Sequence, residues 1–164
     1  MRGRLPFVSV LLALGFGLAG CATLSASGAQ PLRAEQVYSA IQCGSDDKSA
    51  RAAWIADQAA WRQLSAKLHP APEVGVDFDR EGLLLVEMGE RATAGYGVDL
   101  AAPEVEVRAG TAWVRTRWTM PAPGTINAQV ITSPCVVIKL PKGDFDAIRV
   151  VDQNDKQRAR IAVR

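Results

Sequence analysis

The sequence predicts a mainly β domain of the α+β class, an antiparallel β-sandwich or open barrel with one covering helix. First, about eight or nine short apolar or alternating runs are separated by Gly, Pro, Asn and Asp turn signals, which is typical of sandwiches and barrels. Second, a single stretch has helical spacing, with Trp54, Gln58, Trp61 and Leu68 on one face. Third, about 130 residues remain after an unusual N-terminal segment, the size of one domain.

The first predicted strand covers residues 36–44, where apolar and polar positions alternate. Residues 51–68 allow two interpretations, a helix throughout or a strand at 51–56 followed by a helix at 58–68. We predict the second, because Asp57 is a good N-cap residue. The helix at 58–68 is common to both.

The rest of the chain predicts strands. The clearest pair is a hairpin turning at Ala109-Gly110, which places Val107 opposite Ala112. Its other face carries Glu104, Glu106, Arg115 and Arg117 as candidate cross-strand ion pairs. Strands are expected at 83–88 (buried on both faces), 96–100, 103–108, 111–120, 127–132, 134–140, 147–152 and 158–163.

The N-terminus has the layout of a secretory signal, with Arg2 and Arg4 before an uncharged run over residues 5–22. The run is shorter than the roughly 20 residues of a membrane-spanning helix. Its end, Leu18-Ala19-Gly20-Cys21, resembles the lipobox of bacterial lipoproteins. The resemblance implies removal of residues 1–20 and attachment of acyl chains such as palmitate to Cys21, which would anchor the protein firmly to a membrane.

The residue after Cys21 is Ala22 rather than Asp, which by resemblance to enterobacterial sorting favours the outer membrane. The predicted location is therefore the bacterial cell envelope, on the outer membrane facing the periplasm. Residues 21–33 are small and polar and predict a flexible tether. The single β-rich domain is expected to cover residues 34–164.

Residues 15–20 match G-x-G-x-x-G but lie inside the predicted signal, without the strand, helix and acidic residue that nucleotide binding needs. Without residues 1–20, Lys plus Arg falls from 19 to 17 and equals the 17 Asp plus Glu. A neutral mature chain gives no electrostatic reason to expect nucleic acid as a partner.

Two cysteines remain beside Cys21. Cys43 and Cys135 are expected to form a disulfide, since an exported protein meets an oxidising compartment. The alternative is two unrelated buried thiols, because sequence alone does not give their separation.

The chain offers little for catalysis or metal binding. The one histidine, His69, precedes a proline on a predicted loop, and no serine lies in G-x-S-x-G. H-E-x-x-H and C-x-x-C are absent. Residues 77–82 imitate the start of a calcium loop, but its twelfth position is Met88 instead of Glu. We expect no enzyme activity, no cofactor and no metal.

A partner or ligand surface is the remaining candidate. Tyr96 lies between two glycines, either as a core residue at a backbone turn or as a contact residue. Trp113, Arg115 and Arg117 share the charged face of the hairpin, and Trp and Arg are common anchors of interfaces.

The segment VDFDREGLLLVEMGERATAGYGVDL, followed by the hairpin, a P-x-P-G loop and QVITSPCVVIKLP, resembles the PrcB C-terminal domain family over about residues 74–140. The most specific parts are Asp77-Phe78, Gly89, residues 93–96, Pro123-Gly124 and residues 132–135. Ala94 stands where the family would have glycine. The resemblance implies an accessory, non-catalytic, membrane-tethered domain, since the family is named for a lipoprotein subunit that helps to assemble or stabilise a surface protease complex.

The function expected from these observations is a membrane-anchored envelope lipoprotein whose domain binds or stabilises an envelope protein, with a protease complex as the candidate. The alternative is a lipoprotein that binds a small ligand or an envelope polymer in a groove near Tyr96 and the prolines.

Overall fold

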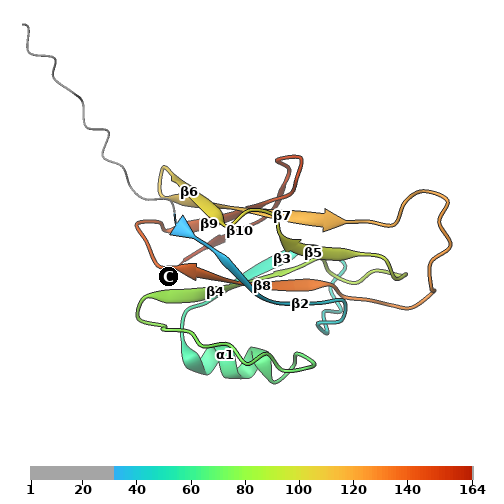
Figure 1. Ribbon diagram of the computed structural model, residues 1–164, viewed down its shortest axis with the longest axis horizontal. Helices are drawn as coiled ribbons and strands as arrows, with labels where there is room; N and C mark the ends of the chain where they lie inside the picture. The colour runs from blue at the N-terminus through green and yellow to red at the C-terminus, as the bar shows by residue number, and fades with distance from the viewer. Residues whose placement is uncertain (1–31, 164) are drawn as a thin grey trace, which may run out of the picture.

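The computed structural model describes residues 32–163 (Figure 1). The predicted signal at 1–20, the lipidation site Cys21, residues 22–31 of the predicted tether, and Arg164 lie outside the described residues. Leu32 and Arg33, the last two residues of that tether, are strand β1 and pair with the domain. Within residues 32–163 there is no helix of the length and apolar character that a membrane crossing needs.

The strands form two sheets, as predicted, and one helix is present among the described residues. Sheet A has the order β1-β6-β7-β9-β10, with β5 also paired to β7, and sheet B has the order β2-β8-β4-β3. The bounds are β1 Leu32–Arg33, β2 Glu35–Ala40, β3 Arg51–Ile55, α1 Gln58–Ser65, β4 Glu81–Glu87, β5 Gly97–Leu100, β6 Glu104–Arg108, β7 Thr111–Thr119, β8 Cys135–Pro141, β9 Ala147–Val151 and β10 Gln157–Ala162.

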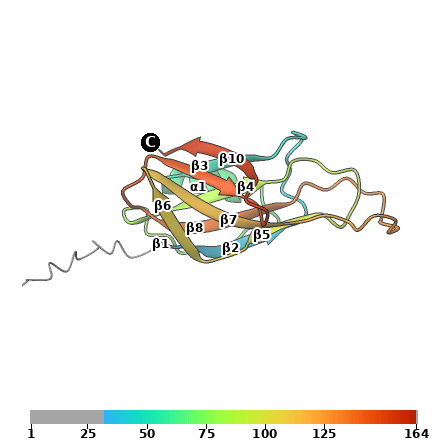
Figure 2. The ribbon, with the colours of Figure 1, turned by 90° about the horizontal axis from the view of Figure 1, so that it is seen from above.

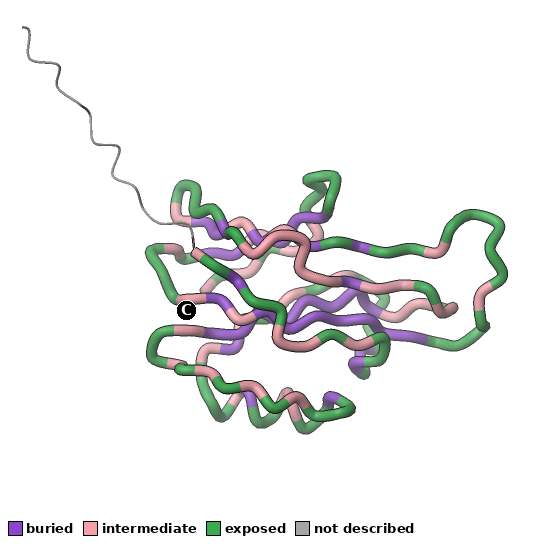
Figure 3. The backbone as a smooth tube through the Cα atoms, viewed as in Figure 1, coloured by how far each residue is buried: buried purple, intermediate pink, exposed green. Residues whose placement is uncertain are grey.

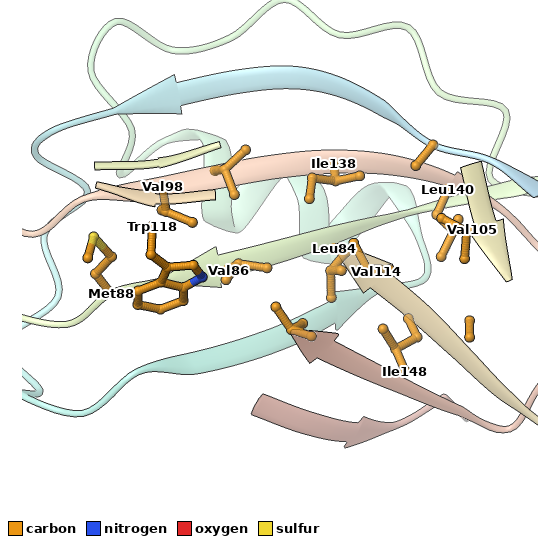
Figure 4. Packing of buried hydrophobic residues seen from close by; sticks show 14 residues of the cluster. Leu84, Val86, Met88, Val98, Val105, Val114, Trp118, Ile138, Leu140 and Ile148 are labelled. Atoms are coloured by element: carbon orange, nitrogen blue, oxygen red, sulfur yellow. The ribbon is translucent and has the colours of Figure 1, made fainter. Parts of the chain in front are cut away.

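Sheet B is the middle layer, between sheet A and α1 (Figures 1 and 2). The core between the sheets contains Leu84, Val86 and Ile138 from sheet B, facing Val114 and Ile148 from sheet A (Figure 4). A second cluster lies under the helix on the other face of sheet B and includes Leu83, Leu85, Val137, Trp61 and Leu68. Strand β4 is therefore buried on both faces, which is why its sequence is apolar at successive positions.

The strand-then-helix interpretation of residues 51–68 is confirmed. Asp57 is the N-cap of α1, and its carboxylate accepts a hydrogen bond of 2.8 Å from the backbone N–H of Ala60. This bond satisfies one of the amide groups that the first turn leaves without a partner. The helix ends at Ser65, three residues before the predicted end, and Leu68 is buried in the turn that follows.

The predicted hairpin is also confirmed, with Val107 opposite Ala112. Ala109 and Gly110 both have positive φ, 46° and 70°, as a two-residue turn between twisted strands requires. The predicted ion pairs across the hairpin are wrong. Arg115 pairs with Asp155, because the turn between β9 and β10 lies beside it; Glu106 pairs with Arg108, and Glu104 with Arg33.

Two further expectations need correction. The sandwich is not wholly antiparallel, because β7 and β9 pair in parallel while the strand between them in the chain, β8, lies in sheet B. Residues 127–131 are a loop rather than a strand, and only Thr132 makes an isolated bridge, to Arg91. Local side-chain bonds, from Thr125 Oγ1 to Ala122 O and from Asn127 Nδ2 to Thr125 Oγ1, stabilise this loop in place of a strand ladder.

Candidate functional site

Two paired segments, residues 89–96 and 120–132, form one end of the sandwich, and we call them the distal loops. They lie at the end opposite the β6–β7 turn (Figure 1). Arg91 and Thr132 exchange two backbone hydrogen bonds, of 2.7 and 2.8 Å, and the N–H of Ala94 donates to Ala128 O at 3.0 Å. The loops are thus held to each other although neither contains a regular strand over most of its length.

The residues at the end of the second loop and directly after it connect the loop to sheet B. Ser133 is 1% exposed, and its hydroxyl accepts hydrogen bonds from the backbone N–H groups of Cys43 and Gly44. Thr132 Oγ1 donates to Thr93 O, and Pro134 O accepts from the N–H of Met88. Cys135 forms the predicted disulfide with Cys43, with Cα atoms 6.0 Å apart, so that prediction is confirmed.

Two glycines let neighbouring backbone approach the first distal loop. Gly89 has φ +80°, and a Cβ there would lie 2.7 Å from the carbonyl oxygens of Asp47 and Ser49. Gly95 has φ +95°, and a Cβ there would lie 3.0 Å from Asn127 Oδ1 in the second loop. Both positions combine a left-handed backbone with a close contact, so glycine is required at each.

Exposed apolar side chains gather at this end. In residues 32–163, six large hydrophobic side chains are exposed, and four belong to the second distal loop: Met120, Ile126, Val130 and Ile131. A fifth, Ile41, lies beside that loop, because its carbonyl accepts a hydrogen bond from the N–H of Ser133. Figure 3 shows the extended, exposed course of this loop. Exposed apolar groups concentrated in one place are typical of interaction sites.

Tyr96, the last residue of the first distal loop, connects that loop to the core. It is half-buried and packs against the core between the sheets, with the Arg91 guanidinium 5.8 Å from the ring centroid. The structure therefore places Tyr96 partly in the core, the first of its two sequence interpretations.

The second surface is the outer face of sheet A, which no described element covers. One row of residues in register crosses four strands there: Glu106 on β6, Trp113 on β7, Arg149 on β9 and Arg160 on β10. We call Arg108, Trp113, Arg115, Arg117, Arg149 and Arg160 the arginine face.

Trp113 is held between two guanidinium groups. The Cζ of Arg149 lies 4.4 Å from the centroid of the Trp113 ring system, and that of Arg108 lies 5.3 Å from it. Arg115 is hydrogen-bonded to Asp155, and this bond, with the charges of Asp155 and Glu106, raises the pKa of Arg115. Arg117 is exposed on the same strand. These contacts fix the positions of Trp113 and Arg115 before any partner binds.

The four residues proposed from sequence as one surface thus fall into two. Tyr96 belongs to the distal loops, whereas Trp113, Arg115 and Arg117 lie on the arginine face. Sequence reasoning missed Arg149 and Arg160. The sequence does contain a sign of them, because each of the last two strands has an arginine between two apolar residues. In a strand with one buried face, such a polar position points outward.

The described residues offer few groups that are arranged for catalysis or metal binding. His69 is exposed, and its backbone carbonyl accepts a hydrogen bond of 3.3 Å from Tyr38 Oη. Residues 32–163 contain no group of three or more His, Cys, Asp or Glu side chains placed to hold a metal ion. In the calcium-like segment, Asp77 instead closes a turn, with its side chain accepting from the N–H of Asp79 and its carbonyl from that of Arg80.

Within residues 32–163, three cavities open to solvent stand out, and Tyr96 is not among the residues that line these three. One of about 460 Å³ is lined by Asp146, Ala147 and residues 160–163. One of about 260 Å³ is the most apolar and is lined by Trp54, Ala56, Lys142, Gly143, Phe145 and Val163. A smaller one of about 180 Å³ lies between β2 and β5.

Comparison with known proteins agrees with the sequence resemblance. Residues 83–141 match the family model described as PrcB C-terminal. The matched segment runs from β4 to the end of β8 and contains both distal loops and strand β7 of the arginine face. Neither a curated protein nor a solved structure matches the chain.

Proposed function

We propose that this protein is a lipid-anchored component of the bacterial cell envelope whose domain binds or stabilises an envelope protein. The match of residues 83–141 to the family model described as PrcB C-terminal supports this proposal. In this proposal the domain catalyses no reaction itself, and a protease complex is the partner that the family resemblance suggests.

The observation that supports partner binding most directly is the set of exposed apolar side chains on the distal loops. Ile126 is fully exposed, and Met120 and Ile131 are 62% and 61% exposed. A second protein that covered them would gain about 25 cal/mol for each Å² of apolar surface removed from water. Apart from Asp77-Phe78, the residues most specific to the PrcB resemblance lie in these loops or fix their ends: Gly89, 93–96, Pro123-Gly124 and 132–135.

Anchoring through Cys21 places the domain on a membrane, and the proposed site is the outer membrane facing the periplasm. Mass spectrometry of the mature N-terminus tests this part: we expect a chain that begins at an acylated Cys21. An unmodified Cys21 or a retained signal segment would refute the anchor and leave the binding proposal to stand separately.

Capture of the partner tests the binding proposal. The full-length protein is cross-linked in intact cells, solubilised and purified, and a stoichiometric protein partner is expected. The double substitution Ile126→Ser with Val130→Ser removes apolar surface from an exposed loop and should abolish capture. Val107→Ser is the matched control, since Val107 is the sixth exposed hydrophobic residue and lies on β6, outside the distal loops. Equal capture by all three proteins would contradict the role of the loops.

Ligand binding is the second candidate function, and the apolar cavity lined by Trp54 and Phe145 supports it. The two rings are packed edge to face with centroids 6.5 Å apart, and Lys142 and Gly143 complete the wall. Titration with soluble peptidoglycan fragments, followed by NMR, would show shifts at the Trp54 indole if this candidate is correct. Shifts that are absent or spread over the surface would count against it.

A further inference from the structure

The arginine face contains two cations that form no ion pair within residues 32–163. Arg149 and Arg160 lie directly opposite each other on neighbouring strands, on the outward face. Side chains opposite each other in an antiparallel pair are neighbours, with Cβ atoms about 4.5–5.5 Å apart, and like charges in that position destabilise the sheet. The pair therefore brings a like-charge repulsion that no ion pair within residues 32–163 offsets.

Four acidic residues near this face already have partners, and Asp146, which lines a cavity with Arg160, forms no ion pair with it. Glu106 pairs with Arg108, Asp155 with Arg115, and Glu104 with Arg33. Asp99, opposite Arg117 in the register of β5 and β7, accepts a hydrogen bond of 3.1 Å from Gln36. Among residues 32–163, no ion pair or side-chain hydrogen bond involves Arg149 or Arg160, and the Nε of Arg149 is buried without an acceptor.

Trp113 holds one member of this pair, Arg149, in place. The indole packs against the guanidinium of Arg149 and of Arg108. Stacking uses the face of a guanidinium and leaves its N–H edges for planar, bidentate acceptors. Carboxylates fit that description. A half-buried tryptophan between arginines is also the composition found at the energetic centres of protein interfaces.

We propose that the arginine face binds an acidic segment of a protein partner, with Arg149 and Arg160 contacting its carboxylates beside Trp113. The site is separate from the distal loops, and it rests on the proposed function only in taking the ligand to be a protein. Together the two surfaces would let the domain contact a partner through one apolar and one charged region.

An anionic membrane is the competing ligand, and the face is poorly suited to it. Interfacial binding to lipid requires apolar side chains that enter the headgroup layer. Of the exposed large hydrophobic side chains in the described residues, none is on the arginine face, and Trp113 is held between guanidinium groups. The predicted mature chain also has no net charge, so attraction to an anionic surface would have to come from this face alone.

The test uses the full mature protein in detergent and a fluorescent deca-glutamate peptide as the probe, with deca-glutamine as the uncharged control. We expect deca-glutamate to bind and to be weakened by salt. Arg149→Glu with Arg160→Glu should lower its affinity about tenfold or more, because two charge-assisted contacts are lost. The matched control is Arg62→Glu with Lys67→Glu, which makes the same charge change at two exposed residues of α1 and the turn after it. That control should bind as the wild type does.

A third variant separates binding from folding. The single substitution Arg160→Glu places opposite charges across β9 and β10, so it should stabilise the sheet while it weakens peptide binding. Equal loss of binding in both double variants, or binding that survives in Arg149→Glu with Arg160→Glu, would overturn the proposal. Binding of phosphatidylglycerol vesicles that depends on Arg149 and Arg160, without binding of deca-glutamate, would overturn it in favour of lipid. Failure to capture a cellular partner would count against the proposed function and leave the peptide result unaffected.

Discussion

Gly82 shows how one residue without a side chain fixes the position of another. The indole of Trp54 lies against β4 at this position, and a Cβ on residue 82 would be 2.2 Å from Cζ2 and 2.5 Å from Cη2 of Trp54. Phe145 packs edge to face on the same indole. Trp54 therefore has β4 on one side and the β8–β9 connection on another, and it forms the wall of the apolar cavity.

Gly82→Ala should destabilise the protein by about 1–3 kcal/mol, the usual cost of forcing extra atoms into a packed region, because the Trp54 ring must move. Urea unfolding followed by circular dichroism measures the change. Gly75→Ala is the control, since a Cβ at residue 75 meets no atom within 4 Å and its φ is not positive. Equal stability of the two variants would show that the indole moves away without cost.

Residues with local roles were predictable, and those with distant partners were not. Asp57 caps the helix that starts at the next residue, and Ala109-Gly110 turns a hairpin between adjacent strands, so sequence spacing was sufficient for both. The role of Gly82 depends on Trp54, a residue of another strand. Likewise, the partner of Arg115 is Asp155, forty residues away in sequence, instead of the glutamates of its own hairpin.

Among the described elements, the β9–β10 hairpin has the turn with the most side-chain hydrogen bonds. Asp152 is 1% exposed, and its Oδ1 accepts from the N–H groups of Asn154 and Lys156 while its Oδ2 accepts from Arg158. The next residue, Gln153, bonds through its side-chain amide to both the N–H and the C=O of Trp118. Strand β9 ends at Val151 and does not reach as far as Trp118 on β7. The side-chain amide of Gln153 therefore provides Trp118 with the two backbone hydrogen bonds that a neighbouring strand would otherwise make.

Acid should weaken this hairpin. Burial by itself would raise the pKa of Asp152, but the N–H groups of Asn154 and Lys156 and the charge of Arg158 outweigh it and lower the pKa below the ordinary 3.8. A lowered folded pKa gives stability that is present above the unfolded value and is lost as pH falls through the folded one. We expect the contribution of Asp152 to be complete at neutral pH and to decline below about pH 4.

Asp152→Asn tests this directly. At pH 7 the variant should be less stable by about 1–3 kcal/mol, because a charge-assisted network is weakened. The difference from the wild type should shrink as the pH is lowered below 4, because the carboxyl group of the unfolded wild type takes up its proton first and that of the folded protein follows only at lower pH. Urea unfolding over a pH series measures it, with Asp144→Asn at an exposed site as the control. A difference that stays constant with pH would exclude the carboxylate charge as its cause.

The segment at 127–132 shows what an element needs beyond its own sequence. Its alternation is typical of a strand, yet residues 127–131 have no strand neighbour on either side. Neither sheet includes this segment. The prolines before it, Pro121 and Pro123, lie in the part of the chain that runs to the distal end. The pattern of exposed Ile126, Val130 and Ile131 belongs to a surface instead of a core.

At the scale of the whole molecule, the two-layer sandwich with one covering helix was predictable from the repeated strand and turn signals, whereas its connectivity was not. The chain passes from β7 in sheet A to β8 in the centre of sheet B and back to β9. Local patterns define each strand, but which sheet receives it depends on how all the apolar faces are buried together. The arginine face was missed in part for this reason, because Arg149 and Arg160 join Trp113 only through the parallel pairing of β7 with β9.

The disulfide should be a large contributor to the stability of this arrangement. Cys43 and Cys135 are 92 residues apart, and closing a loop of that length is worth about 4–5 kcal/mol in the chain-entropy model. Cys43→Ala with Cys135→Ala should lower the free energy of unfolding by up to about that amount, measured in urea. Hydrogen exchange should increase most at the amides of Thr132, three residues before Cys135 in the chain, and of Arg91, to which Thr132 is hydrogen-bonded. If hydrogen exchange at these two amides is the same in the variant, the disulfide stabilises the protein only through its effect on the unfolded state.

The positions of the cysteines have a further consequence for a protein proposed to associate with a protease. The exposed loop at 120–131 lies between Cys43 and Cys135 in the chain, so a cut in it leaves one cysteine of the disulfide in each fragment. The fragments also share both sheets, since β4 in one pairs with β8 in the other, and β7 in one pairs with β9 in the other. A chain nicked at its most exposed loop would remain one folded molecule, migrate as full length without reductant, and separate into two bands only after reduction and denaturation.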